Sequence, residues 1–402
     1  MDSAAFDIIV SGHLCLDLIP DLSGVCRGDM ASPGRLTESG PIGVSTGGTV
    51  SNTGLALHRL GARVGLMASV GDDLLGKLTV DFLRTRHPDL TKLISTQSGQ
   101  SSSYSVVLAP LGSDRSFLHY PGTNASFSAE HIDYLAARSA KIFHLGYPPL
   151  MPRLIADDGR ELLSIYAQMK EMGLTTSMDM VVPDPNGASG KADWSSILER
   201  VLPQVDVFLP SIDEALFMLR RADYDRWNDR VLDRVDADYL YDLAGELLDL
   251  GVVVAGFKLG AMGLFVRTAD ATSCRRLAKT GIDPNQWSEV THWQPAYDVT
   301  VAGTTGAGDA AYAGFLAAML QGLPPSDCLK WASAVGACNV EAVDATSGVR
   351  TWEETARRID AGWVTRQMHL PKYNQTQKEI FGRFQPSIAR ARQSTEQRTD
   401  HE

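Results

Sequence analysis

Short apolar runs alternate with amphipathic segments through the middle of the chain. Strand-like runs such as KIFHLG and VDVFLP each precede a segment with apolar residues at helical spacing, such as DEALFML. This alternation of strands and helices predicts right-handed crossovers and a largely parallel sheet in an α/β fold. Because ligands bind beyond the carboxyl ends of the strands in such sheets, functional residues are expected in the loops after each strand.

The first third of the chain has a different pattern. FDIIVSGHLCLDLIP predicts a buried strand interrupted at Gly12, and residues 23–48 are rich in glycine, proline and serine, as loops and edge strands are. SNTGLALHRLGA predicts a helix that ends at Gly61, and the alternating apolar residues of RVGLMASVG predict a strand. SSSYSVVLAP and RSFLHYPG predict a hairpin with its turn at residues 111–114.

Three later segments interrupt the α/β pattern. Residues 221–237 are densely charged and predict a solvated helical insertion, and residues 270–297 indicate a long excursion before the next motif. Residues 372–402 are polar and mixed in charge, so we expect a helical or disordered tail. Residues 1–371 are therefore expected to form the main domain.

The composition limits the kinds of binding partner and the cellular compartment that we expect for this protein. A net charge of −11 disfavours a nucleic-acid or anionic-membrane surface, although a local cradle could still bind a small anion. No apolar run approaches the length of a membrane span, and the amino terminus lacks the basic region of a signal peptide. The five cysteines show no CxxC spacing, which indicates reduced thiols and predicts a cytoplasmic protein.

Two glycine-rich segments resemble phosphate-binding motifs, but neither has all the features that such a motif needs to bind phosphate. GDDLLGKL approaches a P-loop, but Leu78 stands where a hydroxyl would hold Mg²⁺, and two acids occupy the phosphate region. GAGDAA fits the dinucleotide pattern, but the next segment, PPSDCLKWASAVG, predicts a helix where that fold needs a strand. A nicotinamide-dependent oxidoreductase is therefore disfavoured.

The segment VAGTTGAGDAAYAGF places an acid inside a turn suited to an anion. The amides of Gly306, Ala307 and Gly308 could stabilise a phosphoryl group while Asp309 accepts the proton of an attacking hydroxyl. Alternatively, Asp309 only complements the dipole of the helix that follows. The residues of this segment alone leave both interpretations open.

Two long segments together favour the first interpretation. TGGTVSNTGLALHRLGARVGLMASVGDDLLG (46–76) resembles the first signature of the PfkB family, the ribokinase-like carbohydrate kinases, and TTGAGDAAYAGFL (304–316) resembles the second. FLHYPGTNA, HLGYPPLMP, PSIDEALFML and KLGAMGLFV extend the resemblance in the order of the family. It covers residues 6 to about 350.

The resemblance implies a fold and a reaction. The fold would be a ribokinase-like three-layer α/β/α sandwich with a mostly parallel, doubly wound sheet. A small β lid would come from about 15–45 and 100–120, and two lids could pair in a homodimer. The reaction would be ATP- and Mg²⁺-dependent phosphorylation of a hydroxyl on a sugar or sugar-like substrate, with no distinction among sugars, sugar acids and nucleosides.

The resemblance also implies roles for individual residues. Asp309 would be the catalytic base, with residues 306–308 as the anion hole. The remaining roles are substrate binding by Asp17, Gly47, Gly48 and Asn52, nucleotide binding by Lys258, Gly260, Gly263 and Ser333, and Mg²⁺ organisation through water by Glu214. Alternatives stay open for three of them: Asn52 could cap a helix, Glu214 could be a first-turn helix acid, and Ser333 could be a packing residue.

The chain departs from the family pattern at two positions. Ser211 replaces the asparagine of the Asn-x-x-Glu element, and Gly303 replaces an acid that helps to bind a monovalent cation in potassium-activated members. These departures motivate a second hypothesis, a ligand-binding regulatory protein with little or no kinase activity. His13, His119 and His144 have no metal-like spacing, so we expect them to be hydrogen-bonding or core residues.

Overall fold

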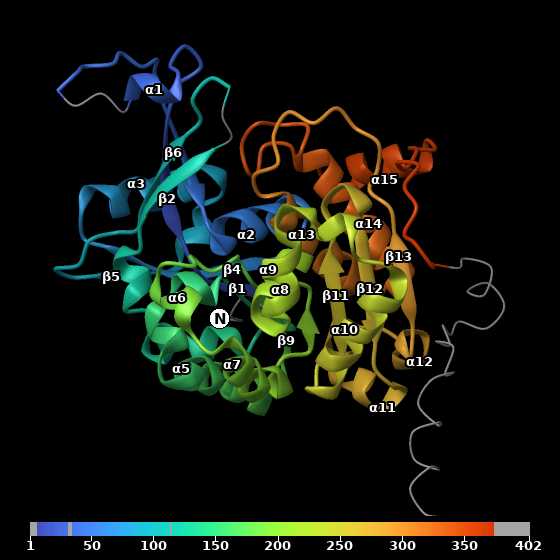
Figure 1. Cartoon of the computed structure of the whole chain (residues 1–402). Helices are drawn as coiled ribbons and strands as arrows, with labels where there is room; N and C mark the ends of the chain where they lie inside the picture. The colour runs from blue at the N-terminus through green and yellow to red at the C-terminus, as the bar shows by residue number, and fades with distance from the viewer. Residues whose placement is uncertain (1–5, 31–33, 113–114, 374–402) are drawn as a thin grey trace, which may run out of the picture.

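A nine-stranded sheet forms the centre of the molecule (Figure 1). The structure is a computed structural model that describes residues 6–30, 34–112 and 115–373. The strands lie in the order β13-β12-β11-β10-β9-β8-β1-β4-β5. Their bounds are β1 Ile8–Gly12, β4 Val64–Gly71, β5 Leu93–Gln97, β8 Ile142–Gly146, β9 Thr175–Asp179, β10 Val207–Phe208, β11 Val254–Lys258, β12 Leu264–Thr268 and β13 Thr291–Gln294.

The sheet is parallel from β11 to β5, and near the other edge β12 pairs antiparallel with both β11 and β13. Helices cover both faces, as the strand–helix alternation predicts. The described α-helices are α1 Arg27–Met30, α2 Thr49–Arg59, α3 Leu74–Arg86, α4 Tyr134–Ala137, α5 Pro152–Glu171, α6 Ala188–Lys191, α7 Trp194–Val201, α8 Ile212–Leu219, α9 Arg221–Trp227, α10 Ala237–Asp249, α11 Ala271–Cys274, α12 Pro284–Trp287, α13 Ala307–Leu320, α14 Pro325–Asn339 and α15 Trp352–Asp360.

The central sheet separates two hydrophobic cores. Residues of α5, α7, α8 and α10 pack on one face, and residues of α2, α3, α13 and α14 pack on the other. Successive strand residues point to opposite faces, so Ile142 enters the second core and Phe143 the first. Complete burial of one such side chain stabilises the fold by about 1.5–3 kcal/mol. The structure bears out the expected three-layer α/β/α sandwich.

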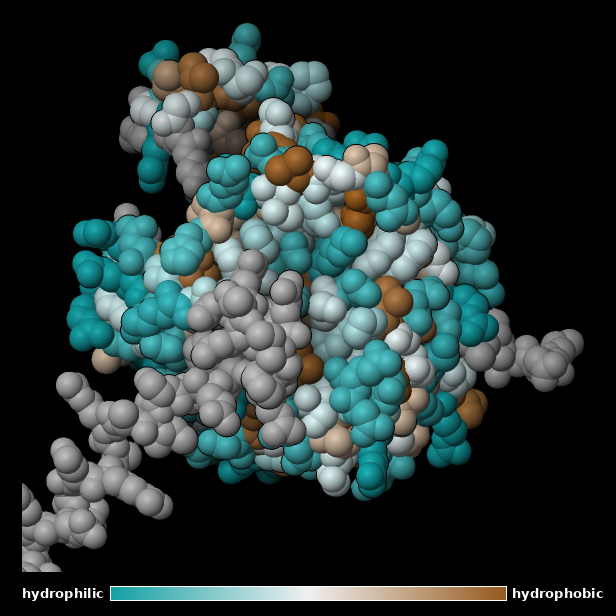
Figure 2. All heavy atoms as spheres, turned by 90° about the vertical axis from the view of Figure 1, so that its right-hand side faces the viewer, coloured by the Kyte–Doolittle hydropathy of each residue, from teal (hydrophilic) through white to brown (hydrophobic). Residues whose placement is uncertain are grey.

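A separate four-stranded sheet projects from the body as a lid (Figure 1). Its order is β3-β2-β6-β7, with bounds β2 Cys15–Pro20, β3 Ile42–Gly47, β6 Tyr104–Leu108 and β7 Ser116–Tyr120. β6 and β7 form the expected antiparallel pair, and β3 is an edge strand. At the top of Figure 2 the end of the lid stands clear of the body and exposes large hydrophobic residues.

Two sequence predictions need correction, and a third is confirmed. The run FDIIVSGHLCLDLIP forms two strands in different sheets, and the first strand ends at Gly12, whose φ of 116° is one that residues with side chains seldom adopt. The strand predicted from RVGLMASVG is confirmed as β4, and every residue of it is buried because helices cover both sides of the sheet. Residues 270–297 are more than an excursion, since they contain the edge strand β13.

The structure also describes the two glycine-rich decoy segments and the beginning of the predicted tail. Asp73, in the segment that approaches a P-loop, caps α3 by accepting a hydrogen bond from the amide of Gly76, and it also accepts one from the amide of Ser102 outside the helix. The segment after GAGDAA is a helix, α14, as expected. The hydroxyl of Tyr373 still accepts a hydrogen bond from the amide of Trp293, and residues 374–402 of the predicted tail lie outside the described chain. No described helix combines the length and hydrophobicity needed to cross a bilayer.

Candidate active site

Asp309 lies in the first turn of α13, directly after the glycine-rich turn. Gly306 precedes the helix with φ at 73°, and a side chain there would come within 2.5 Å of the carbonyl oxygen of Ala345. A glycine is therefore required for the chain to enter the helix at this point. The Asp309 side chain is buried, with the residue only 3% exposed.

Three side chains donate hydrogen bonds to the Asp309 carboxylate. Asn52 Nδ2 lies 3.1 Å and the Tyr147 hydroxyl 2.7 Å from Oδ2, and the Thr53 hydroxyl lies 3.0 Å from Oδ1. The carboxylate therefore turns away from its own helix toward α2 and the loop after β8. This geometry disfavours the interpretation of Asp309 as a simple helix-capping acid.

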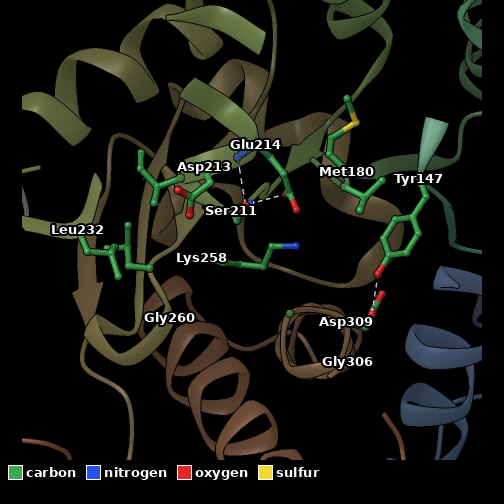
Figure 3. Close-up of a pocket in the computed structure, with 14 residues that line it drawn as sticks. Tyr147, Met180, Ser211, Asp213, Glu214, Leu232, Lys258, Gly260, Gly306 and Asp309 are labelled. Carbon is green, nitrogen blue, oxygen red and sulfur yellow. Dashed lines mark hydrogen bonds between the residues drawn. The ribbon is translucent and has the colours of Figure 1, made fainter. Parts of the chain in front are cut away.

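Tyr147 is held in an unusual conformation beside Asp309 (Figure 3). Its backbone has φ at 66°, in the left-handed region that non-glycine residues seldom adopt, and its amide donates to the carbonyl of Asp179. Burial, together with the nearby Asp309 carboxylate, raises the pKa of the Tyr147 hydroxyl well above its usual value. The hydroxyl thus keeps its proton and serves Asp309 as a hydrogen-bond donor.

Lys258, at the end of β11, forms a buried ion pair with Asp179, at the end of β9. Its Nζ lies 2.6 Å from Asp179 Oδ1. Burial opposes the charge of the ammonium, but the carboxylates of Asp179 and Glu214 more than offset it, so the pKa of Lys258 is raised. The amine points into the cavity between Glu214 and Asp309 (Figure 3).

Glu214 stabilises the start of α8 and also lies beside Lys258. Its Oε2 accepts a hydrogen bond of 2.6 Å from the amide of Ser211, whose hydroxyl in turn caps α8 through the amide of Glu214. Burial raises the pKa of Glu214, and the Lys258 charge counteracts this. Glu214 is therefore a first-turn acid that stabilises the start of α8, as the alternative interpretation held. It also lines the cavity that contains Asp309.

Two cavities meet at this edge of the sheet. The first, of about 350 Å³, is lined by Tyr147 and by six residues expected from the sequence or its resemblance: Glu214, Lys258, Gly260, Gly306, Gly308 and Asp309. The second, of about 340 Å³, is lined by six such positions, of which the first three are shared with the first cavity: Lys258, Gly260, Gly308, Gly263, Ala307 and Ser333. The Ser333 hydroxyl donates to the carbonyl of Pro295, so its hydrogen is already engaged.

The residues expected to bind substrate lie at the base of the lid, outside both cavities. A side chain at Gly47 would come within 2.4 Å of Asp17 Oδ2, and one at Gly48 would meet His13. Both glycines thus allow close approach of the backbone to these side chains. Burial raises the pKa of the Asp17 carboxyl to about 6. Asn52 lies inside α2 and caps nothing, because Gly48 precedes that helix.

The structure shows the neighbours of two other positions noted in the sequence, Gly303 and His144. A side chain at Gly303 would meet the carbonyl oxygens of Ala342 and Val343, and the Arg115 guanidinium reaches this place from the lid. His144 is buried between Thr49 and Ser177, with its ring nitrogens 3.3 and 2.9 Å from their hydroxyls. His144 is thus a core histidine, as expected.

Comparison with known families decides the class of protein. The family described as pfkB family carbohydrate kinase matches residues 6–352. The chain belongs to this family. Its place among the pfkB carbohydrate kinases confirms the resemblance carried by the two glycine-rich segments and identifies the chain as an enzyme of the kinase class.

This pfkB family member is similar to curated proteins and to solved structures along most of its length. It is 25% identical over 296 residues to an uncharacterized sugar kinase of Archaeoglobus fulgidus, covering 73% of this chain and 98% of that protein. It is 24% identical over 340 residues to 2-dehydro-3-deoxygluconokinase of Bacillus subtilis, covering 82% and 90%. A putative ribokinase II of E. coli, solved with ATP and Mg²⁺, superposes with a TM-score of 0.66 at 18% identity, covering 89% and 99%.

Sequence reasoning missed three residues of this pfkB site: Thr53, Tyr147 and Asp179. Two of them carry a usable signal, because Tyr147 directly follows β8 and Asp179 ends β9. Polar residues at the carboxyl ends of parallel strands are the positions where such sheets place ligand contacts. Thr53 carries no comparable signal, since it differs little from the other small residues of α2.

Proposed function

We propose that this protein transfers the γ-phosphoryl group of ATP to a hydroxyl of a sugar or sugar-like substrate. The observation that carries the proposal is the buried Asp309 carboxylate, which faces the same cavity as Lys258 and Glu214. In-line phosphoryl transfer requires positioning, an electrostatic cradle and a base, and this cavity offers groups suited to each.

Asp309 acts as the general base in this proposal. It accepts the proton of the attacking hydroxyl as that oxygen forms its bond to the phosphorus atom. Asn52, Thr53 and Tyr147 hold the carboxylate in place through hydrogen bonds of 2.7–3.1 Å. A base positioned in this way contributes ~10²–10⁴-fold to the rate.

Lys258 and the glycine-rich turn serve the phosphate side. The Lys258 ammonium borders both cavities, so it lies where a nucleotide in the second cavity would extend its phosphates into the first. The amide of Ala307 donates to the carbonyl of Thr304, so the anion hole depends on the amides of Gly306 and Gly308 unless that turn opens. Both groups would stabilise charge on the phosphoryl oxygens.

The site has features that suit both ATP and Mg²⁺. Small and apolar residues line the second cavity, including Val299, Ala332, Ala337 and Val340, and these suit the flat face of a nucleotide base. Glu214 and Asp213 border the first cavity and could hold the water ligands of Mg²⁺, which keeps several waters when bound. Bound Mg²⁺ would supply Lewis-acid neutralisation of phosphate charge.

The acceptor is held between the base and the lid. Asn52 donates its amide hydrogen to Asp309, while its carbonyl oxygen is buried and lacks a hydrogen-bond partner among the described residues. An acceptor hydroxyl would satisfy that oxygen. Asp17 supplies a second acceptor for substrate hydroxyls from the lid strand β2.

The test is ADP release by the purified protein over a panel of sugars, sugar acids and nucleosides, with nucleotide binding measured in parallel. Turnover with at least one acceptor supports the kinase. Nucleotide binding without turnover on any acceptor would favour the ligand-binding regulatory alternative, which Ser211 and Gly303 motivate.

Removal of the Tyr147 hydroxyl should change the pH dependence of the reaction. Because that hydroxyl donates to the Asp309 carboxylate, Tyr147→Phe destabilises the charged base, and the acidic limb of the kcat/KM profile should move to higher pH. A hydrogen bond to a charged group contributes about 1.5–3 kcal/mol, so we expect kcat/KM to fall about tenfold or more. Tyr166→Phe is the control, since its buried hydroxyl donates to the carbonyl of Ser177 instead. An unchanged profile in Tyr147→Phe would contradict the positioning role.

The lid supports a proposal that the protein is a homodimer. All five residues of β7 are exposed, including Phe117 and Leu118 at 56% and 62%, and Ile42 and Val44 are exposed on β3. Burial of such a patch against a second lid would remove it from water. Light scattering should give twice the chain mass of 43.5 kDa. Leu118→Asp should shift this to the monomer, whereas Leu135→Asp, on the exposed helix α4, should not. A wild-type monomer would reject the proposal.

A further inference from the structure

Two histidines and a cysteine meet where the chain passes from the body to the lid. His13 follows β1, Cys15 begins β2, and His119 lies on β7. The two imidazoles face each other with their Nε2 atoms 3.4 Å apart and their ring centroids 5.1 Å apart. One donor atom from each of the three side chains lies within 4.8 Å of the others. The proposed phosphoryl transfer uses none of these groups.

Hydrogen bonding leaves part of this cluster unsatisfied. A single hydrogen can bridge the two Nε2 atoms, but His13 Nδ1 remains buried without a partner among the described residues. His119 Nδ1 lies 3.0 Å from the Ser105 hydroxyl, which fixes the orientation of that ring.

We propose that His13, Cys15 and His119 form a binding site for Zn²⁺ or a similar transition-metal ion. The separation of the two Nε2 atoms matches that of two ligands in a tetrahedral site with Zn–N bonds of about 2.0–2.1 Å. Two imidazoles and a thiolate select borderline and soft ions over Mg²⁺ or Ca²⁺. His119 is exposed, which leaves the ion a path from solvent.

Charge and proton balance fit this assignment. The ion binds the Cys15 thiolate, and the thiol proton leaves to solvent, so the ion and its three ligands carry one net positive charge. Asp17 Oδ1 lies 3.4 Å from Cys15 Sγ, so its carboxylate would offset that charge, or it would fill the fourth position in place of water. The ion would connect His13, which lies between the body and the lid, to two lid strands, β2 and β7.

The same cluster lies near Asp17, so a substrate hydroxyl is the competing occupant. A hydroxyl oxygen about 2.7–3.2 Å from both Nε2 atoms would have them only about 65–80° apart, well below the tetrahedral angle that its hydrogen bonds prefer. A metal ion is small enough to bind both nitrogen atoms at this spacing. The observed geometry therefore favours the ion.

The test is a Co²⁺ titration of the chelator-treated full chain, followed by absorption spectroscopy. We expect one Co²⁺ per chain, visible bands of tetrahedral coordination and a near-ultraviolet thiolate band, all removed by Zn²⁺. His119→Ala and Cys15→Ser should weaken binding at least about tenfold. Cys26→Ser, at an exposed lid cysteine, should leave it unchanged.

The outcomes that overturn the proposal are distinct. Absence of the Co²⁺ bands in the wild type, or bands that survive in His119→Ala, would exclude this site. An increase in acceptor KM for His119→Ala in chelated protein, without metal binding by the wild type, would assign the cluster to the acceptor instead. Because β7 is exposed, His119→Ala should keep the wild-type melting temperature in chelator, which shows that the variant is folded.

Discussion

Replacement of Asp309 by asparagine is expected to lower kcat by ~10²–10⁴-fold while nucleotide binding persists. Asparagine is nearly isosteric, and the hydroxyls of Thr53 and Tyr147 can rotate to accept a hydrogen bond from its amide. The substitution therefore removes the proton acceptor with little change in packing. ADP release with an active acceptor measures kcat, and calorimetry with ATP measures binding.

The control for Asp309→Asn is Asp73→Asn, at another acid near the start of a helix. Asparagine is as good a helix cap as aspartate, and Asp73 lies outside both cavities, so this variant should keep its activity. Turnover in Asp309→Asn close to that of the wild type would show that another group accepts the proton and would refute the assignment of the base.

Replacement of Lys258 by methionine is expected to reduce both activity and stability. The substitution keeps the apolar stem but removes the charge beside the proposed phosphate path, so kcat/KM for ATP should fall by about 10²–10³-fold. It also leaves the buried Asp179 carboxylate without its partner, and breaking a buried ion pair in this way costs about 3–5 kcal/mol. Steady-state kinetics and denaturant unfolding measure the two effects separately.

The stability loss of Lys258→Met should depend on pH with a defined sign. Burial already raises the pKa of Asp179 to about 7, with Lys258 opposing the shift, so the variant raises it further. A carboxyl with a higher pKa in the folded state binds more protons there than in the unfolded chain, so stability falls as pH rises. The variant should therefore lose more stability at pH 8.5 than at pH 5.5.

Lys170→Met is the matched control for Lys258→Met. Lys170 also pairs with a buried carboxylate, Asp206, but Arg276 contacts the same group at 2.7 Å. Asp206 precedes β10 and lies away from the carboxyl ends of the strands, so this variant should lose some stability and keep its kinetics. An equal loss of activity in both lysine variants would attribute the effect of Lys258 to folding alone.

The sequence predicts the sheet class and the glycine-rich turn because both depend on local pattern. The strand–helix alternation fixes the crossovers, and GAGDAA can only turn into a helix at Gly306, where a side chain would meet Ala345. The separate lid sheet is less visible, since Gly12 marks a break between β1 and β2 but nothing in the local pattern assigns the two strands to different sheets. Its assignment comes from the resemblance to the family.

Contacts between side chains that are far apart in the sequence cannot be predicted from local sequence patterns. Lys258 was expected at the nucleotide, but its partner Asp179 lies 79 residues earlier, and no periodicity joins the two. His13 and His119 are 106 residues apart, so their spacing along the chain shows no metal motif even though their Nε2 atoms are in contact. Lys258 and Asp179 meet because β11 and β9 lie on either side of β10 in the central sheet, whereas His13 and His119 meet because the lid sheet, which contains β7, joins the body just after β1.

The contact between Asn52 and Asp309 spans 257 residues of the chain. A ribosome makes the chain from its amino terminus, so α2 is complete long before α13 leaves the exit tunnel. Until then Asn52 and Thr53 lack the Asp309 carboxylate, and the face of α2 that packs against α13 stays exposed to water. No product of premature termination before residue 309 can therefore contain the proposed base, however well its earlier strands have paired.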